Sequence, residues 1–305
     1  MNDDKALETK EQKQSPLIFG EVLFDCFPDG REKLGGAPFN VAWNLQAFGM
    51  SPLLISRVGH DDLGRRIKEI MRSWDMDSSC LQIDPSSPTG TVRIDLTNGE
   101  PRFTILPDQA YDYIAPLNVN QKREMLFLYH GTLALRNDVS RKTLSLLKHE
   151  YQCPVFVDVN LRPPWWNNDD VLTLIEGATW LKLNETELDL LFPGKADMEQ
   201  RCRQLLERFQ LEAVFITLGE KGSAALNRNN IFSATKPQKN IAIMDTVGAG
   251  DAFSSVLLLG LIHGWPLTTS MQRSQEFASA VVGQRGAITH DKNFYKTFSD
   301  KWNLR

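Results

Sequence analysis

Asp245-Thr-Val-Gly-Ala-Gly-Asp-Ala-Phe-Ser254 is the stretch on which the fold prediction depends. Its two glycines lead directly into an apolar segment that contains Val256, Leu257 and Leu261, which predicts a glycine-rich loop followed by a buried helix. Glycine lets backbone N–H groups approach a ligand closely, and the N-terminus of a helix carries partial positive charge. The stretch therefore predicts an anion site suited to a phosphoryl group in transfer. The residues of this site are Gly248, Ala249 and Gly250.

Asp251 follows the loop in the first turn of the predicted helix. A carboxylate beside the anion can accept the proton of an attacking hydroxyl, which makes Asp251 a candidate general base. The alternative is that Gly248-Ala-Gly250 forms only a tight turn and that Asp251 only adds a favourable charge to the first turn. Taken alone, these four residues leave both interpretations open.

Around this stretch, short apolar runs alternate with segments of helical period, as in βαβ proteins. Residues 17–24 are predicted to form one buried strand. Residues 91–97 and 102–106 flank Asn98-Gly99 and predict a β-hairpin, which suggests a small sheet that serves as a lid. Two helices, at about 250–263 and 267–284, are predicted to close the chain.

The composition is that of an ordinary globular protein, because 42% of the 305 residues are hydrophobic, 24% are charged and the net charge is -4. No run of Lys or Arg favours nucleic acid or an anionic membrane as a partner. The four cysteines lack C-x-x-C spacing and the histidines do not cluster, which argues against a transition-metal site. No apolar stretch is long enough to span a bilayer, and residues 1–15 lack the apolar core of a signal peptide. We therefore expect a cytoplasmic protein.

The ten-residue string that ends at Ser254 resembles the D-T-x-G-A-G-D-A-F signature of the PfkB (ribokinase-like) carbohydrate kinases. A second string, Leu34-Gly-Gly-Ala-Pro-Phe-Asn-Val-Ala42, resembles the N-terminal glycine motif of the same family in the form common among fructokinases. Gly35 and Gly36 would open space beside a sugar, and Asn40 would offer a donor and an acceptor to its hydroxyls. A helix-capping turn with a solvent-facing Asn40 is the alternative.

Other strings resemble motifs of the family in the same order. Gly20-Glu-Val-Leu-Phe-Asp25 is similar to the first strand, whose terminal Asp binds sugar hydroxyls. Asp158-Val-Asn-Leu-Arg-Pro163, before two tryptophans, is similar to the D-x-N-x-R-P-x-x-W stretch of fructokinases. Asn184-Glu-Thr-Glu187 resembles the N-x-x-E element that organises magnesium and phosphates, and Thr217-Leu-Gly-Glu-Lys-Gly222 resembles the nucleotide loop.

Each of these strings also has a structural alternative. Asp25 fits a turn residue and Arg162 fits a surface ion-pair partner. Asn184 fits a helix N-cap, with Glu187 completing a capping box. No G-x-x-x-x-G-K-[ST] P-loop and no H-R-D and D-F-G pair is present, so neither the P-loop enzymes nor the protein kinases are indicated.

The resemblance spans about residues 17–290 and implies a ribokinase-like three-layer α/β/α sandwich, with a mainly parallel central sheet and a small inserted β-sheet lid. The domains would be a flexible tail of residues 1–15 and a kinase domain of residues 16–305, with the lid formed from about 24–35 and 89–107. The implied site residues are Asp251, Gly248, Ala249 and Gly250 for catalysis; Asp25, Gly35, Gly36, Asn40, Phe103, Asn160 and Arg162 for the sugar; Lys182, Asn184, Thr217, Gly219, Gly222 and Gly250 for ATP; and Glu187 for Mg²⁺ through water.

The resemblance further implies Mg²⁺ with ATP as the cofactor, and a monovalent cation such as K⁺ near Asp245 and Gly286. Lids in this family often pair across dimers, so a homodimer through the lid is expected, although the residues alone do not decide the oligomeric state.

The forms of the motifs look most like fructokinase, which implies phosphorylation of D-fructose to fructose 6-phosphate. Phe39 is large where the family has a small residue, and Val159 stands where many fructokinases carry proline. These departures leave 2-keto-3-deoxygluconate, ribose, another hexose or a nucleoside as alternative substrates. An acidic substrate would need a cation near the lid, for which Arg93 or Arg102 is available, although both also fit as solvent-facing residues of the hairpin. A catalytically silent sugar-binding regulatory protein is the alternative from another class.

Overall fold

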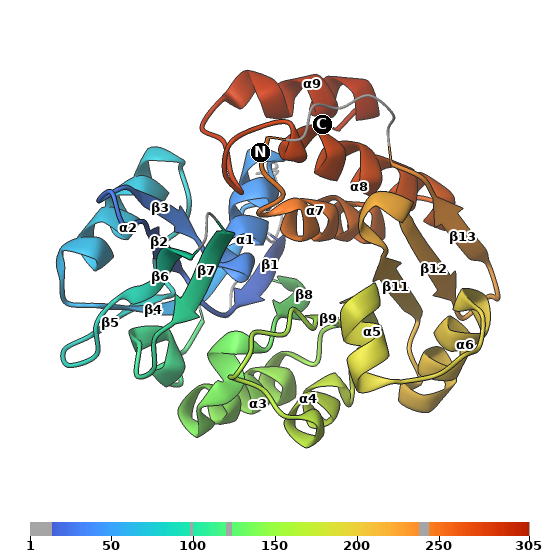
Figure 1. The fold of residues 1–305 in the computed structure, drawn as a ribbon, viewed down its shortest axis with the longest axis horizontal. Helices are drawn as coiled ribbons and strands as arrows, with labels where there is room; N and C mark the ends of the chain where they lie inside the picture. The colour runs from blue at the N-terminus through green and yellow to red at the C-terminus, as the bar shows by residue number, and fades with distance from the viewer. Residues whose placement is uncertain (1–13, 98–99, 120–123, 238–243, 305) are drawn as a thin grey trace, which may run out of the picture.

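The computed structural model describes residues 14–97, 100–119, 124–237 and 244–304. Within these ranges nine strands form one sheet in the order β13-β12-β11-β10-β9-β8-β1-β4-β5 (Figure 1). Neighbouring strands from β11 to β5 run parallel, whereas β12 is antiparallel to both β11 and β13. The strands are β1 (Gln14–Phe19), β4 (Leu53–Gly59), β5 (Leu81–Asp84), β8 (Glu124–His130), β9 (Val155–Asp158), β10 (Trp180–Asn184), β11 (Ala213–Thr217), β12 (Ser223–Asn227) and β13 (Phe232–Thr235).

Helices cover both faces of this sheet (Figure 1). Alternate residues of a strand enter different cores: Ile18 packs with the helices of one face, and Leu17 and Phe19 pack with those of the other. The first face carries α1 (Ala37–Ala47), α2 (Asp62–Ser73), α7 (Ala249–Ile262), α8 (Leu267–Val282) and α9 (Lys292–Trp302), and the second carries α3 (Asp138–Tyr151), α4 (Asn168–Ile175), α5 (Glu185–Leu191) and α6 (Met198–Phe209). The predicted three-layer α/β/α sandwich is confirmed.

A separate four-stranded sheet, on the left of Figure 1, has the order β3-β2-β6-β7. Its strands are β2 (Leu23–Cys26), β3 (Glu32–Gly35), β6 (Gly90–Thr97) and β7 (Glu100–Ile105). The hairpin of β6 and β7 is present as predicted, although its turn at residues 98–99 lies outside the described residues. Residues 1–13 of the predicted tail also lie outside them.

The prediction of a single strand over residues 17–24 is wrong. β1 ends at Phe19 and β2 begins at Leu23, so the chain leaves the main sheet at residues 20–22 and enters the small one. Gly20 has φ +147°, and a Cβ atom there would lie 2.4 Å from Cγ of Pro38, which explains why the turn requires glycine. The break is invisible in the pattern because Val22 and Leu23 stay buried on the other side of it.

The prediction that two helices close the chain is also wrong, because α9 follows them. Tyr295, Phe298 and Trp302 share one face of α9 and pack against Phe277 of α8, with ring centroids 5.2 Å apart for Phe298 and 5.9 Å apart for Tyr295. Asp291 caps the helix by accepting a hydrogen bond from the N–H of Asn293.

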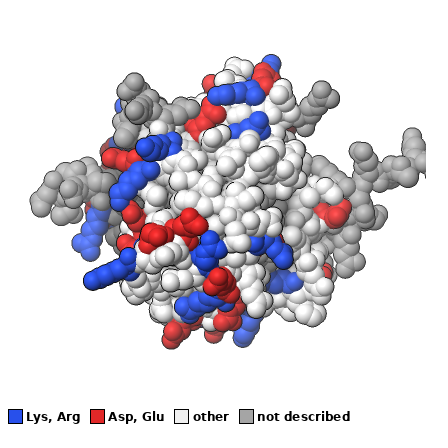
Figure 2. Space-filling model, turned by 90° about the vertical axis from the view of Figure 1, so that its right-hand side faces the viewer, with Lys and Arg blue, Asp and Glu red and all other residues white. Residues whose placement is uncertain are grey.

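The surface on the side of α6 and β13 carries both signs of charge. Figure 2 shows Lys and Arg there interspersed with Asp and Glu around a broad uncharged area. Among the described residues, no helix combines the length and the apolar character that crossing a membrane requires.

Candidate active site

The N-terminus of α7 is built for a ligand rather than for a capping side chain. Gly248 is its N-cap, in the left-handed region with φ +82°, and no side chain accepts a hydrogen bond from the first turn. A Cβ atom at Gly248 would lie 2.4 Å from Cβ of Ala287, so only glycine fits there. The first N–H groups of a helix have no partner within the helix and can bind an anion, and at this turn the N–H of Ala249 makes only a long hydrogen bond of 3.4 Å to the carbonyl oxygen of Thr246.

Asp251 lies in the first turn of α7 and contacts α1. Nδ2 of Asn40 donates a hydrogen bond of 2.7 Å to Oδ2 of Asp251. Asn40 is only 4% exposed, so the alternative of a solvent-facing Asn is wrong. Burial raises the pKa of Asp251 to about 6, against the opposing hydrogen bond from Asn40 and the charges of Lys182 and Arg162. A carboxylate with that pKa is largely ionised at pH 7 and can act as a base.

A buried ion pair supports this turn from behind. Nζ of Lys182 lies 2.8 Å and 2.9 Å from the two carboxylate oxygens of Asp158, its register partner on the neighbouring strand. Oγ of Ser254 in α7 and the hydroxyl of Tyr129 also donate to Asp158, at 2.7 Å and 3.2 Å. A Cβ atom on Gly250 would lie 3.6 Å from Nζ of Lys182. The network therefore ties α7 to three strands and holds an ammonium group beside the anion site.

Four of the residues predicted to bind the sugar, Asp25, Gly35, Gly36 and Asn40, lie where the small sheet meets α1. Gly36 is the N-cap of α1 with φ +106°, and a Cβ atom there would lie 2.6 Å from the carbonyl oxygen of Glu21. At Gly35 a Cβ atom would lie 3.8 Å from Oδ2 of Asp25, so Gly35 adjoins the Asp25 carboxyl. Burial raises the pKa of Asp25 to about 6, while the charges of Lys33 and Arg162 oppose the shift.

Arg162 follows β9, and its charge lowers the pKa of Asp25, Asp251 and Glu21. Within the described ranges Arg162 forms no ion pair, although it is exposed at the surface as the alternative expects. Asn160 precedes it in the left-handed region with φ +46°. Phe103 lies on β7 with 52% of its surface exposed. The sugar contacts of these residues stay predictions.

The residues predicted to bind ATP lie at the ends of β10 and β11. Thr217 ends β11, and the following loop needs glycine at Gly222, where φ is +104° and a Cβ atom would lie 1.9 Å from the carbonyl oxygen of Thr235. Gly219, at φ +58°, faces open space.

Asn184 and Glu187 form the capping box that was the structural alternative. The side chain of Asn184 accepts from the N–H of Glu187 at 2.9 Å, and Oε2 of Glu187 accepts from the N–H of Asn184 at 2.8 Å. Oε1 of Glu187 accepts from the N–H of Leu161 at 2.8 Å, which joins α5 to the segment that carries Arg162. Because both carboxylate oxygens hold backbone N–H groups, the geometry fits a contact with a metal through water better than a direct one.

Asp245 and Gly286, the two residues expected near a monovalent cation, are in contact. Oδ2 of Asp245 accepts a hydrogen bond of 3.0 Å from the N–H of Gly286. Nζ of Lys33, from β3 of the small sheet, lies 3.5 Å from the same oxygen. An ion pair therefore links the small sheet to the strand–helix loop that carries the anion site.

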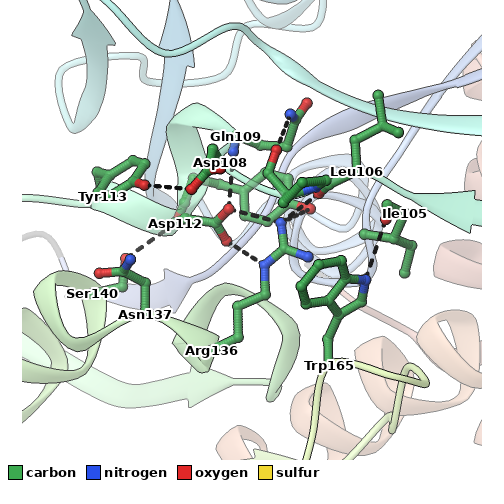
Figure 3. Close-up of polar contacts among 12 residues, drawn as sticks. Ile105, Leu106, Asp108, Gln109, Asp112, Tyr113, Arg136, Asn137, Ser140 and Trp165 are labelled. Atoms are coloured by element: carbon green, nitrogen blue, oxygen red, sulfur yellow. Dashed lines mark hydrogen bonds and ion pairs between the residues drawn. The ribbon is translucent and has the colours of Figure 1, made fainter.

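Arg136 holds the segment that leaves the small sheet (Figure 3). Its Nε and Nη2 donate to Asp112 at 2.6 Å and 2.7 Å, and Nη2 also donates to the carbonyl oxygen of Leu106 at 2.6 Å. The guanidinium lies 4.2 Å from the ring centroid of Trp165, whose Nε1 donates to the carbonyl oxygen of Ile105 at 3.2 Å. Both side chains thus fix the exit of β7.

The sequence analysis did not assign a role to Glu21, Lys33, Arg136 or Asp158. Glu21 and Asp158 could have been singled out, because each is a single charged residue in an otherwise apolar run. Lys33 and Arg136 carry no such signal, because their partners lie more than 20 residues away in the sequence.

Comparisons with known proteins agree with this geometry. Residues 23–293 match the model of the pfkB family carbohydrate kinases. The chain is 30% identical to the fructokinase of Klebsiella pneumoniae over 293 residues, which cover 89% of this chain and 94% of that protein. The fructokinase of Vibrio cholerae O395, solved with fructose, ADP and calcium ion, superimposes with a TM-score of 0.78 at 25% identity over 94% of this chain and 99% of that one.

A double mutant of the Vibrio enzyme, solved with fructose, ADP and potassium ion, superimposes with a TM-score of 0.76 at 26% identity, over 93% of this chain and 98% of that one. The fold, the order of the motifs and these matches lead to one conclusion about ancestry: the chain belongs to the pfkB family of carbohydrate kinases.

Proposed function

We propose that the protein is an ATP-dependent fructokinase that converts D-fructose to fructose 6-phosphate. The observation that carries the proposal is the contact of Asn40 with Asp251, because it joins the predicted sugar motif to the predicted phosphoryl-transfer motif at one helix N-terminus. The fructokinases from Klebsiella and Vibrio, which match over nearly the whole chain, support the choice of sugar.

The reaction places each group in a defined role. The sugar hydroxyl attacks the γ-phosphorus of ATP, its proton passes to the Asp251 carboxylate, and the bond from phosphorus to the ADP oxygen breaks. The N–H groups of Gly248, Ala249 and Gly250 stabilise the charge that develops on the phosphoryl oxygens. The sugar is oriented by Asp25, Gly35, Gly36, Asn40, Phe103, Asn160 and Arg162, so its entropy is lost before the chemical step.

ATP is held by Lys182, Asn184, Thr217, Gly219, Gly222 and Gly250. Mg²⁺ bound with ATP would neutralise phosphate charge, and the capping geometry of Glu187 suits a role through water. The carboxylate of Asp245 suits a monovalent cation such as K⁺. The small sheet acts as a lid that excludes water, and the protein works in the cytoplasm, as a homodimer if its lids pair.

The test is ADP release with MgATP against fructose, ribose, 2-keto-3-deoxygluconate, glucose, mannose, fructose 6-phosphate and adenosine. Turnover on fructose that is lost in Asp251→Asn would support both the sugar and the base. Turnover on another compound would overturn fructose and keep the mechanism. Folded protein that binds a sugar but turns over none would favour a regulatory role, which the intact Asp251 and glycine turn argue against.

A further inference from the structure

Glu21 is a buried carboxylate that the mechanism above does not use. It lies between β1 and β2, at the point where the chain crosses from the main sheet into the small one, and it is only 4% exposed. The backbone of the same residue lowers the pKa of the carboxyl, against the larger effect of burial. Its Oε2 is buried and has no hydrogen-bond partner in the described part of the chain. A buried acceptor without a donor is costly, so a group that supplies a donor is expected there.

Asn40 and Arg136 each carry a buried atom in the same condition. Oδ1 of Asn40 has no partner, although its Nδ2 binds Asp251. Nη1 of Arg136 has none, although the other nitrogens of that guanidinium bind Asp112 and Leu106. The charges that act most on the carboxyl of Glu21 are those of Arg162, Asp251 and Arg136, in that order. Glu21 also adjoins the predicted sugar motif, because a Cβ atom on Gly36 would lie 2.6 Å from the carbonyl oxygen of Glu21.

These orphaned atoms define the chemistry of a ligand. Two acceptors and one donor match hydroxyl groups, which donate through hydrogen and accept through oxygen. An anionic ligand matches the Oε2 of Glu21 poorly, because the charges of Glu21 and Asp251 would repel it and the charge of Arg136 is already paired with Asp112 at 2.6 Å, which leaves Arg162 as the opposing cation. The fitting ligand is a neutral polyhydroxyl compound.

We propose that Glu21 is a further sugar-binding residue, whose Oε2 accepts a hydrogen bond from a sugar hydroxyl other than the one that is phosphorylated. The inference rests on the proposed function, and it adds a contact at the joint between the two sheets. Burial also raises the pKa of Glu21 to about 7, so the charged form that accepts this hydrogen bond predominates only above that pH.

The experiment compares wild type with Glu21→Gln, which keeps the size of the side chain and removes its charge. We expect KM for the sugar to rise roughly 10- to 100-fold, as for loss of a hydrogen bond to a charged group, while kcat and KM for ATP change less than about threefold. Asp84→Asn is the matched control, because Asp84 is an equally buried carboxylate (3% exposed) that pairs with Arg57 next to the edge of the main sheet. The control should leave KM for the sugar unchanged.

A set of fructose analogues, each lacking one hydroxyl, separates contact from a merely structural role. The analogue that lacks the hydroxyl bound by Glu21 should lose kcat/KM in wild type and lose nothing more in Glu21→Gln. The other analogues should lose the same factor in both proteins. Equal losses for every analogue, or an unchanged KM for the sugar, would overturn the proposal. Glu21→Asp, which retains the charge but shortens the side chain, should show the same selective pattern. It is the variant to use if Glu21→Gln does not fold.

Turnover by the wild-type protein distinguishes failure of this proposal from failure of the proposed function. If wild type phosphorylates a sugar other than fructose, the fructokinase proposal fails, and the same comparison is made with single-deoxy analogues of that sugar. If wild type neither phosphorylates nor binds any sugar of the panel by calorimetry, both proposals fail.

Discussion

Replacement of Lys182 by methionine leaves the Asp158 carboxylate buried without its counter-charge. The two side chains belong to residues that are 5% and 2% exposed, and their ion pair is bidentate at 2.8 Å and 2.9 Å. Loss of one partner of such a pair costs about 3–5 kcal/mol of the free energy of unfolding. Ser254 and Tyr129 still donate to Asp158, so we expect the lower end, about 3 kcal/mol. For a chain of 305 residues this lowers Tm by roughly 5 °C.

The assay is thermal unfolding without ligands, followed by circular dichroism, on wild type, Lys182→Met, Asp158→Asn and the double variant. The double variant removes both charges, so it should recover most of the stability that Lys182→Met loses. Lys221→Met is the matched control, because Lys221 pairs with Glu185 at 2.9 Å on the surface, where such a pair contributes about 0–1 kcal/mol. Wild-type stability of Lys182→Met, or additive losses in the double variant, would refute the reasoning.

Three further outcomes are expected at the N-terminus of α7. Asp251→Asn should lower kcat by about 10²- to 10⁴-fold with KM for ATP nearly unchanged, and a coupled ADP assay that finds kcat within threefold of wild type would contradict the role of base. The pKa of Asp251 is about 6, and its protonated form accepts no proton, so kcat/KM for the sugar should fall about tenfold per pH unit below that value. A flat profile from pH 5 to 8 would count against the assignment. Gly248→Ala forces a side chain into φ +82° and against Ala287 at 2.4 Å, so it should cost about 2–4 kcal/mol, and an unchanged Tm would show that the turn adapts.

The elements whose signal is local were predictable from the sequence. β11 follows a continuous apolar run, and the predicted start of the helix after the glycine turn differs from α7 by one residue. The capping box at Asn184 was foreseen as an alternative because its signature is four residues long. What could not be predicted depends on register: Lys182 and Asp158 meet because β10 and β9 align them, and no local pattern states that alignment.

The break at Gly20 was missed for a related reason. The apolar run continues through Val22 and Leu23, and these residues stay in the same two cores as Ile18 and Leu17, respectively. Burial alone therefore does not reveal that the chain changes sheets. The helix α9 was visible in principle, because Tyr295, Phe298 and Trp302 recur at helical spacing.

Two of the chain segments that connect the sheets, residues 20–22 and Gly36, are also part of the proposed sugar pocket. If the small sheet acts as the proposed lid, the sugar is held in part by the segments about which that sheet moves. An engineer who reshapes the pocket for a bulkier sugar would change the swing at the same time. Selectivity and protection of ATP from wasteful hydrolysis should therefore shift together, and libraries that alter only one of them should be sought in β6 and β7, away from these joints.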